Sequence, residues 1–262
     1  MLKQKPPARL WSPGDFASLL FPQRCPFCDN PLPFRPRIRS PLPEKAEEDS
    51  WIHAACYPQK NLVKGALCFR CGKPLGETTE AFCSDCRNKQ YHFKRNCAIW
   101  RFEEPARSAV TRFKYHGRQQ YALYFARAWL GIHGDYLKEE AKPQILIPVP
   151  IHKSRLRKRG YNQAALLAYE LEKLTGISCR EDVVIRTKHT GAQKDLGPAE
   201  RLKNMENAFR IRHFPEGISR VLIVDDIYTT GSTLESISRL LSEAGIPEIY
   251  TATLCVAGGE SD

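Results

Sequence analysis

The chain lacks a long hydrophobic run. No stretch of 18 or more apolar residues occurs in its 262 residues, so the sequence predicts no membrane-spanning helix. The apolar run Phe16–Phe21 is too short and too interrupted for a signal peptide, and we expect a cytoplasmic protein.

Acidic residues are too few to balance the basic ones. The 29 acidic and 40 basic side chains leave a formal net charge of +11. Such a surface attracts polyanions such as pyrophosphate, nucleic acid or an anionic membrane face. Charge alone does not choose among them, and a solvated basic surface without a partner remains open. The length suits one ordinary domain with a small appendage, and the hydrophobic content of 42% is compatible with a real core.

Isolated cysteines are few. Cys97, Cys179 and Cys255 stand alone, and we expect them to be buried structural residues. The other seven lie between Cys25 and Cys86. In a cytosolic chain this clustering indicates metal binding rather than disulfides.

Two Cys-x2-Cys pairs form a zinc-ribbon pattern. Eleven residues separate the pair Cys68 and Cys71 from the pair Cys83 and Cys86. Each pair can direct two thiolates at one tetrahedral ion, so we predict a structural zinc site here.

Another group of metal-ligand residues precedes this ribbon in the sequence. It pairs Cys25 and Cys28 with His53 and Cys56, and Cys₃His is an ordinary zinc set. The intervening residues include a proline-rich insertion at 30–50 that we expect to be poorly ordered. The alternative is that His53 is a surface residue and this site is degenerate or empty.

The segment Val221–Thr233 carries the clearest chemistry. Four apolar residues lead into Asp225 and Asp226, and a turn rich in hydroxyl groups follows. The pattern predicts a buried strand, a turn and a helix whose N-terminus can hold a phosphate group. Glycine in the turn lets the backbone approach the ligand closely. The candidate phosphate-binding residues are Thr229, Thr230, Gly231, Ser232 and Thr233, and the two acids could hold ribose hydroxyls or orient hydrated Mg²⁺.

Strands and helices alternate along the rest of the chain. Apolar runs predict strands at 96–102, 144–150, 221–225 and 249–256, with helices at 105–114, 122–137, 161–174 and 232–244. This order favours a mainly parallel sheet with helices on both faces. We place the zinc-binding module at residues 1–93 and the sheet domain at 94–262.

Two further segments bear on binding. Five of the seven residues in 153–159 are cationic, and we expect a loop there in which Arg155, Arg157 and Arg159 bind pyrophosphate. A solvated basic loop is the alternative. The polar segment 186–209 is typical of a lid that closes over a ligand, or of an ordinary flexible connection.

Several short motifs together resemble the ComF (ComFC/GntX-like) family. They are the N-terminal cysteines, Phe113–Gly117, Val149–Pro150, Arg159–Gln163, the residues Gln193, Arg201, Asn204 and Ala208–Phe209, and the turn after Asp226. That turn resembles the phosphoribosyl-pyrophosphate (PRPP) signature of type I phosphoribosyltransferases. His53-x2-Cys56 and the proline-rich insertion depart from the family pattern.

The resemblance implies a type I phosphoribosyltransferase fold, Mg²⁺-PRPP as ligand and an association with DNA uptake in natural competence. It further implies single-stranded DNA and a helicase as partners. One hypothesis is an enzyme that transfers phosphoribosyl to an unknown acceptor, with Asp225 and Asp226 as its catalytic residues. The alternative is a non-catalytic DNA-uptake factor that senses PRPP or a nucleotide. Thr229 stands where 6-oxopurine salvage enzymes usually have an aspartate, so that activity is not expected.

Overall fold

The chain divides into two compact units, residues 1–57 and 58–262. Its computed structural model describes residues 22–33, 51–56, 61–76, 78–187, 208–214 and 216–258. The smaller unit contains the 3₁₀ helix η1 (Ala54–Cys56) and an isolated bridge between Arg24 and Pro31. The first cysteine group, with Cys25, Cys28, His53 and Cys56, belongs to the smaller unit, and the second cysteine group, with Cys68, Cys71, Cys83 and Cys86, belongs to the larger unit. The division at residues 93 and 94 stays a prediction.

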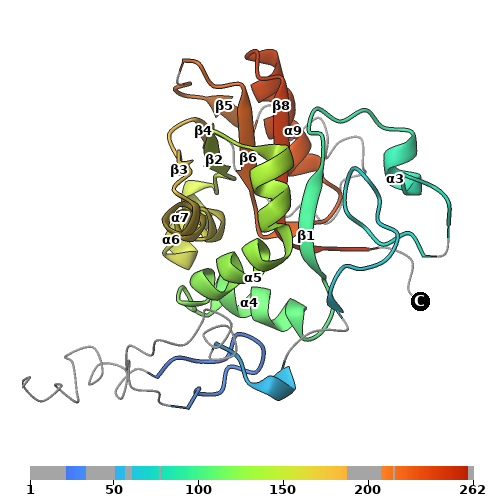
Figure 1. The fold of residues 1–262 in the computed structure, drawn as a ribbon. Helices are drawn as coiled ribbons and strands as arrows, with labels where there is room; N and C mark the ends of the chain where they lie inside the picture. Colours follow the sequence, from blue (N-terminus) through green and yellow to red (C-terminus); the bar gives the residue numbers. More distant parts are fainter. Residues whose placement is uncertain are drawn as a thin grey trace, which may run out of the picture. The chain divides into compact units, whose positions relative to one another are not determined.

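The larger unit is built on a six-stranded parallel sheet (Figure 1). Its strand order is β1-β8-β6-β2-β3, and β7 also pairs with β8. The strands are β1 (Asn96–Arg101), β2 (Ile145–Pro148), β3 (Ser178–Cys179), β6 (Arg220–Val224), β7 (Ile227–Tyr228) and β8 (Glu248–Val256). The central strands are apolar and buried over almost their whole length, as expected when both faces of a parallel sheet are covered.

Helices cover the two faces of this sheet, as the sequence predicts. Within the described residues, the helices of the larger unit are α3 (Ser84–Arg87), α4 (Ala106–Tyr115), α5 (Tyr121–Tyr136), the π-helix η3 (Leu137–Ala141), α6 (Lys153–Arg159), α7 (Gln163–Thr175) and α9 (Ser232–Glu243). Of these, α5, α7 and α9 pack against strands of the main sheet. Val221 and Ile223 of β6 share a core cluster with Leu234 and Ile237 of α9. Because side chains alternate along a strand, Leu222 and its neighbours face the opposite side, where α5 and α7 lie next to each other (Figure 1).

A small antiparallel pair stands apart from the main sheet. It joins β4 (Val184–Arg186) to β5 (Phe209–Ile211). The pair forms the two ends of the predicted lid. Residues 188–207, with most of that prediction, lie outside the described residues.

The basic segment 153–159 forms a helix, so the predicted loop is wrong. Arginine and lysine are good helix formers, and His152 caps the helix by accepting a hydrogen bond from Ser154 N at 3.2 Å. Gly160 ends α6 in the left-handed conformation, with φ +82°.

The three isolated cysteines differ in burial. Cys97 of β1 and Cys255 of β8 are buried as predicted, whereas Cys179 of β3 is only half-buried. Within the part of the chain that the structure describes, no helix has both the length and the apolar character needed to cross a membrane.

Candidate functional site

The two acids occupy an interruption between β6 and β7. Val224 pairs with Ala252 and Ile227 with Cys255, so the register along β8 is the same on both sides of the interruption. The Asp226 carbonyl accepts hydrogen bonds from Leu254 N and Cys255 N, each at 3.1 Å. The backbone is therefore anchored to the sheet while both carboxylates stand at its carboxyl edge, where ligands bind in open parallel sheets.

The hydroxyl-rich turn follows directly. Thr229 and Thr230 are exposed, and Gly231 takes the left-handed conformation with φ +75° before α9 begins at Ser232. Thr230 Oγ1 lies 2.8 Å from Ser232 Oγ. The N-cap residue, Gly231, has no side chain to cap α9, and the first helical N–H, that of Ser232, makes a long hydrogen bond of 3.4 Å to Thr230 Oγ1. The first backbone N–H groups of α9 are thus available to an anion, and the helix dipole favours negative charge there.

Lys114 brings a positive charge to the acid pair. Its Nζ lies 2.9 Å from Asp226 Oδ1, and both side chains are largely buried. Burial by itself would lower the pKa of Lys114, but Asp226 outweighs this effect and holds the pKa above its ordinary value. Lys114 therefore stays charged and offsets part of the negative charge at the sheet edge.

The pKa of Asp225 is strongly raised. Burial, followed by the neighbouring charge of Asp226, raises the pKa of Asp225 to about 7. Lys114 and Arg186 act in the opposite direction without overcoming burial. Part of the residue remains accessible, so a ligand cation or hydroxyl can reach it.

Arg186 adds a second cation from the β4–β5 pair. Its guanidinium lies over the Phe209 ring, 5.2 Å from the centroid. Burial and the nearby charge of Arg155 lower the pKa of Arg186, whereas Asp225 raises it. Arg186 therefore lies close to both the acid pair and α6, where an anionic ligand would relieve the repulsion between the two arginines.

The three predicted pyrophosphate ligands of α6 have different surroundings. Arg155 and Arg159 are half-buried, and their spacing puts them on one face of the helix. Arg157 is exposed. Arg159 donates hydrogen bonds to Gln163 Oε1 and Tyr115 Oη, each at 2.9 Å, so its guanidinium already holds α6 against neighbouring elements. Arg155 is the member of the set with an interaction that reaches Arg186.

Sequence reasoning missed Lys114 and Arg186 as site residues. Both lie in motifs that it singled out, Phe113–Gly117 and the start of the lid segment. Their roles depend on partners far away in the sequence, since Lys114 meets Asp226 and Arg186 lies near Arg155. The only signal for either residue in the sequence was its positive charge within a motif that had already been singled out.

The second cysteine group forms a compact tetrad. The sulfur atoms of Cys68, Cys71, Cys83 and Cys86 all lie within 4.8 Å of one another, and those of Cys71 and Cys83 are 3.7 Å apart. Tetrahedral zinc with bonds of about 2.3 Å to sulfur places its ligands roughly 3.8 Å apart. The group therefore fits a zinc ion without rearrangement.

The first group is equally well assembled. Its four ligand atoms, from Cys25, Cys28, His53 and Cys56, lie within 4.8 Å of one another. His53 Nδ1 lies 3.2 Å from Cys28 Sγ, so His53 joins the cysteines as predicted. Both groups could hold zinc.

Comparisons with known proteins agree with this architecture. Residues 156–261 match the family model of the phosphoribosyl transferase domain. Competence protein F of Haemophilus influenzae is 34% identical over 197 residues, which cover 73% of this chain and 85% of that protein. The chain belongs to the ComF family.

Other members of the ComF family are more distant. DNA utilization protein YhgH of Salmonella typhi is 30% identical, over 72% of this chain and 84% of that protein. Competence protein ComFC of Bacillus subtilis is 26% identical, over 75% and 80% respectively. Among solved structures, a purine phosphoribosyltransferase from Pyrococcus horikoshii covers 50% of this chain and 70% of that chain, at 21% identity and a TM-score of 0.31, a likeness too slight to add to the assignment.

The two cysteine groups predict two zinc ions per chain. Elemental analysis of the purified protein should find both, because each group presents four potential ligand atoms within 4.8 Å of one another. Cys28→Ser and Cys83→Ser should each remove one ion and lower the melting temperature. A wild-type content of one zinc ion would show that one of the groups is not a metal site.

The raised pKa of Asp225 predicts a specific pH dependence of stability. Between about pH 4 and pH 7 the folded protein holds a proton that the unfolded chain releases, so stability falls as pH rises through this interval. Asp225→Asn removes this loss. Its melting temperature should match that of the wild type near pH 4 and exceed it increasingly up to about pH 7.

Asp182→Asn is the matched control. Arg180 lowers the pKa of the exposed Asp182 to about 2, so Asp182 stays ionised across the same interval. The difference between Asp182→Asn and the wild type should be constant from about pH 5 to pH 8, because Asp182 is then ionised in both the folded and the unfolded protein. A constant difference for Asp225→Asn as well would contradict a raised pKa.

Proposed function

We propose that this protein binds Mg²⁺-PRPP and transfers its phosphoribosyl group to an acceptor that remains to be identified. The observation that supports this best is the arrangement at the carboxyl edge of the sheet. An anion-receptive turn, two carboxylates and the cations of Lys114, Arg155 and Arg186 meet there. PRPP needs each of these features, since it carries a phosphate, a ribose diol and a pyrophosphate.

In the proposed complex, the 5′-phosphate lies on the turn Thr229–Thr233 and accepts hydrogen bonds from the first N–H groups of α9. Asp225 and Asp226 accept hydrogen bonds from the ribose hydroxyls. Arg155 and Arg186 face the pyrophosphate, with Arg159 on the same face of α6, whereas Arg157 lies on the opposite face and would act through its charge alone. Mg²⁺, when bound, would neutralise pyrophosphate charge.

The reaction is a displacement at ribose C1. The C1–O bond to pyrophosphate breaks, the electron pair leaves with pyrophosphate, and a lone pair of the acceptor forms the new bond to C1. The transition state resembles an oxocarbenium ion. Catalysis would come from positioning and from cations that stabilise the leaving group, because Thr229 cannot exchange a proton with the acceptor at neutral pH.

The names of the relatives suggest a biological setting. They describe competence and DNA utilization proteins. We therefore propose a role in DNA uptake, in the cytoplasm, with single-stranded DNA and a helicase as candidate partners. None of the ten cysteines, all of which lie among the described residues, forms a disulfide, which suits a reducing compartment.

A PRPP sensor without turnover is the second candidate. It is favoured by the Lys114–Asp226 ion pair, which partly neutralises one of the two acids, and by Thr229. The observations on DNA binding, which this second candidate includes, point in both directions. Of the aromatic residues near the cysteine pairs, Phe27 and Phe93 are buried in packing roles, whereas Phe69 is 50% exposed beside Arg95. Such an aromatic–cation pair can stack a base.

Release of pyrophosphate from Mg²⁺-PRPP separates the two candidates. The enzyme hypothesis predicts release that depends on an acceptor and falls at least about 100-fold in the double variant Asp225→Asn, Asp226→Asn, because both ribose contacts are lost. Asp182→Asn, with an exposed acid away from the site, should keep full activity. Binding of Mg²⁺-PRPP with no release for any acceptor would favour the sensor, and absence of binding would contradict both.

A further inference from the structure

The proposed phosphate turn packs against a buried tyrosine, Tyr228, which also contacts the segment Tyr91–Phe93 just after the second cysteine group. Tyr228 is 2% exposed, and its ring meets that of Phe93 edge to face, with the centroids 6.4 Å apart. A Cβ atom on Gly231 would lie 2.6 Å from Tyr228 Cζ and closer still to its hydroxyl. The turn therefore packs directly against the Tyr228 ring at Gly231.

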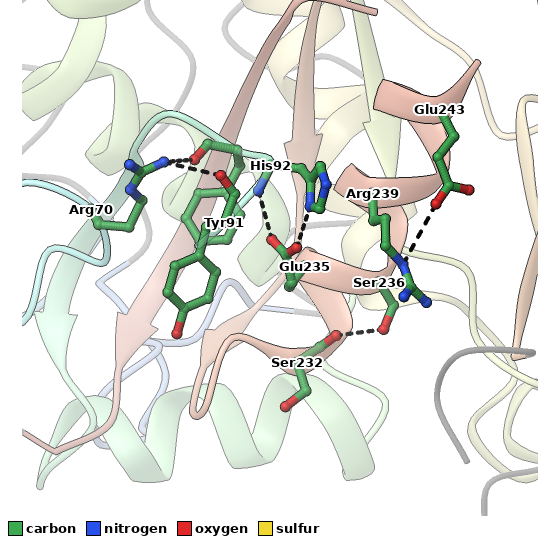
Figure 2. Close-up of polar contacts among 9 residues, drawn as sticks. Arg70, Tyr91, His92, Ser232, Glu235, Ser236, Arg239 and Glu243 are labelled. Carbon is green, nitrogen blue, oxygen red and sulfur yellow. Dashed lines mark hydrogen bonds and ion pairs between the residues drawn. The ribbon is translucent and has the colours of Figure 1, made fainter. Parts of the chain in front are cut away.

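The segment Tyr91–Phe93 also contacts the chain after the turn, at the start of α9. His92 N donates to Glu235 Oε2 at 2.9 Å, and His92 Nδ1 lies 2.5 Å from Glu235 Oε1 (Figure 2). Glu235 lies in the first turn of α9, and its own N–H donates to the Gly231 carbonyl at 2.8 Å. Residues Tyr91–Phe93 therefore contact the chain both before and after the phosphate turn.

The second cysteine group fixes this segment in turn. Arg70, which lies between Cys68 and Cys71, donates to the carbonyls of Tyr91, at 3.3 Å, and Phe93. Figure 2 shows the Arg70 guanidinium directed at this backbone. The Tyr91 hydroxyl interacts with both the Cys86 thiol and the Tyr228 hydroxyl.

The sulfur atoms and the turn also share one apolar core. Cys68, Cys71 and Cys86 belong to the same buried cluster as Phe93, Tyr228 and Leu234. A displacement of the cysteine pairs therefore has to displace the residues that support the turn, since packed cores do not absorb such shifts gradually. Side chains that contact metal ligands orient those ligands, so the two sets of residues are positioned together.

We propose that metal binding by Cys68, Cys71, Cys83 and Cys86 sets the affinity of the turn Thr229–Thr233 for a ribose phosphate. Tyr91 and His92 are the positioning residues. This inference rests on the proposed function. With the metal bound, Tyr91–Phe93 hold Tyr228 and Glu235 so that the N–H groups of the turn converge. Without the metal, the cysteine pairs would no longer hold Arg70 and Tyr91 in place, and the N–H groups of the turn would no longer converge.

Binding of ribose 5-phosphate and of Mg²⁺-PRPP, measured by calorimetry, tests the positioning residues. Tyr91→Phe keeps the ring but removes the hydroxyl between Cys86 and Tyr228. This variant should bind each of the two ligands with about tenfold lower affinity, while its zinc content stays at the wild-type value. Tyr169→Phe removes an exposed hydroxyl that donates to Glu181, and it should bind like the wild type.

Ligand-free hydrogen exchange tests the coupling by itself. The amides of residues 235–238 at the start of α9 should exchange faster in Tyr91→Phe than in Tyr169→Phe. They should exchange faster in Cys86→Ser than in Cys56→Ser, which disturbs the first cysteine group instead. If Cys86→Ser fails to fold, Tyr91→Phe alone decides the question.

The outcomes separate this inference from the proposed function. If the wild type binds both ligands and Tyr91→Phe matches it in affinity and exchange, the coupling is overturned and the proposed function stands. If the wild type binds neither ligand while the exchange difference is present, the proposed function fails and the coupling of the metal group to α9 stands.

Discussion

The contact between Tyr228 and Gly231 is the constraint on which the candidate site depends. The turn can pass over the buried tyrosine ring only because residue 231 has no side chain, and its φ of +75° is one that glycine adopts freely. With the turn held this close, α9 starts immediately beyond the sheet edge and directs its first N–H groups over it. A larger residue would force the turn away from Tyr228 and from the two acids.

The electrostatics of the sheet edge follow from the same geometry. Two acids at adjacent positions at the end of a buried strand repel each other and lose hydration, which raises the pKa of Asp225. Lys114 pairs with Asp226 and Arg186 lies near Asp225, so the edge presents both acidic and basic groups. A ligand with a diol between two anionic groups matches this pattern better than a simple phosphate would.

Contiguous motifs were predictable from the sequence, and long-range contacts were not. The strand, acids, turn and helix of 221–233 lie in one segment whose local pattern determines them, and the spacing of the cysteine pairs identified both groups of candidate metal ligands. The basic segment was misread as a loop because its charge suggested exposure, although its residues favour a helix and His152 caps it. Lys114, Arg186 and the support of the turn by Tyr91–Phe93 arise only when distant segments pack together.

The central claim is that the turn after Tyr228 binds the phosphate of a ribose phosphate. Affinity for ribose 5-phosphate in Gly231→Ala, compared with Gly217→Ala, tests it most directly. Both glycines have nearly the same φ, +75° and +76°, but an added Cβ meets Tyr228 only at residue 231 and finds open space at 217. The account predicts at least about a tenfold loss of affinity in Gly231→Ala and wild-type affinity in Gly217→Ala. Wild-type affinity in both variants would contradict it.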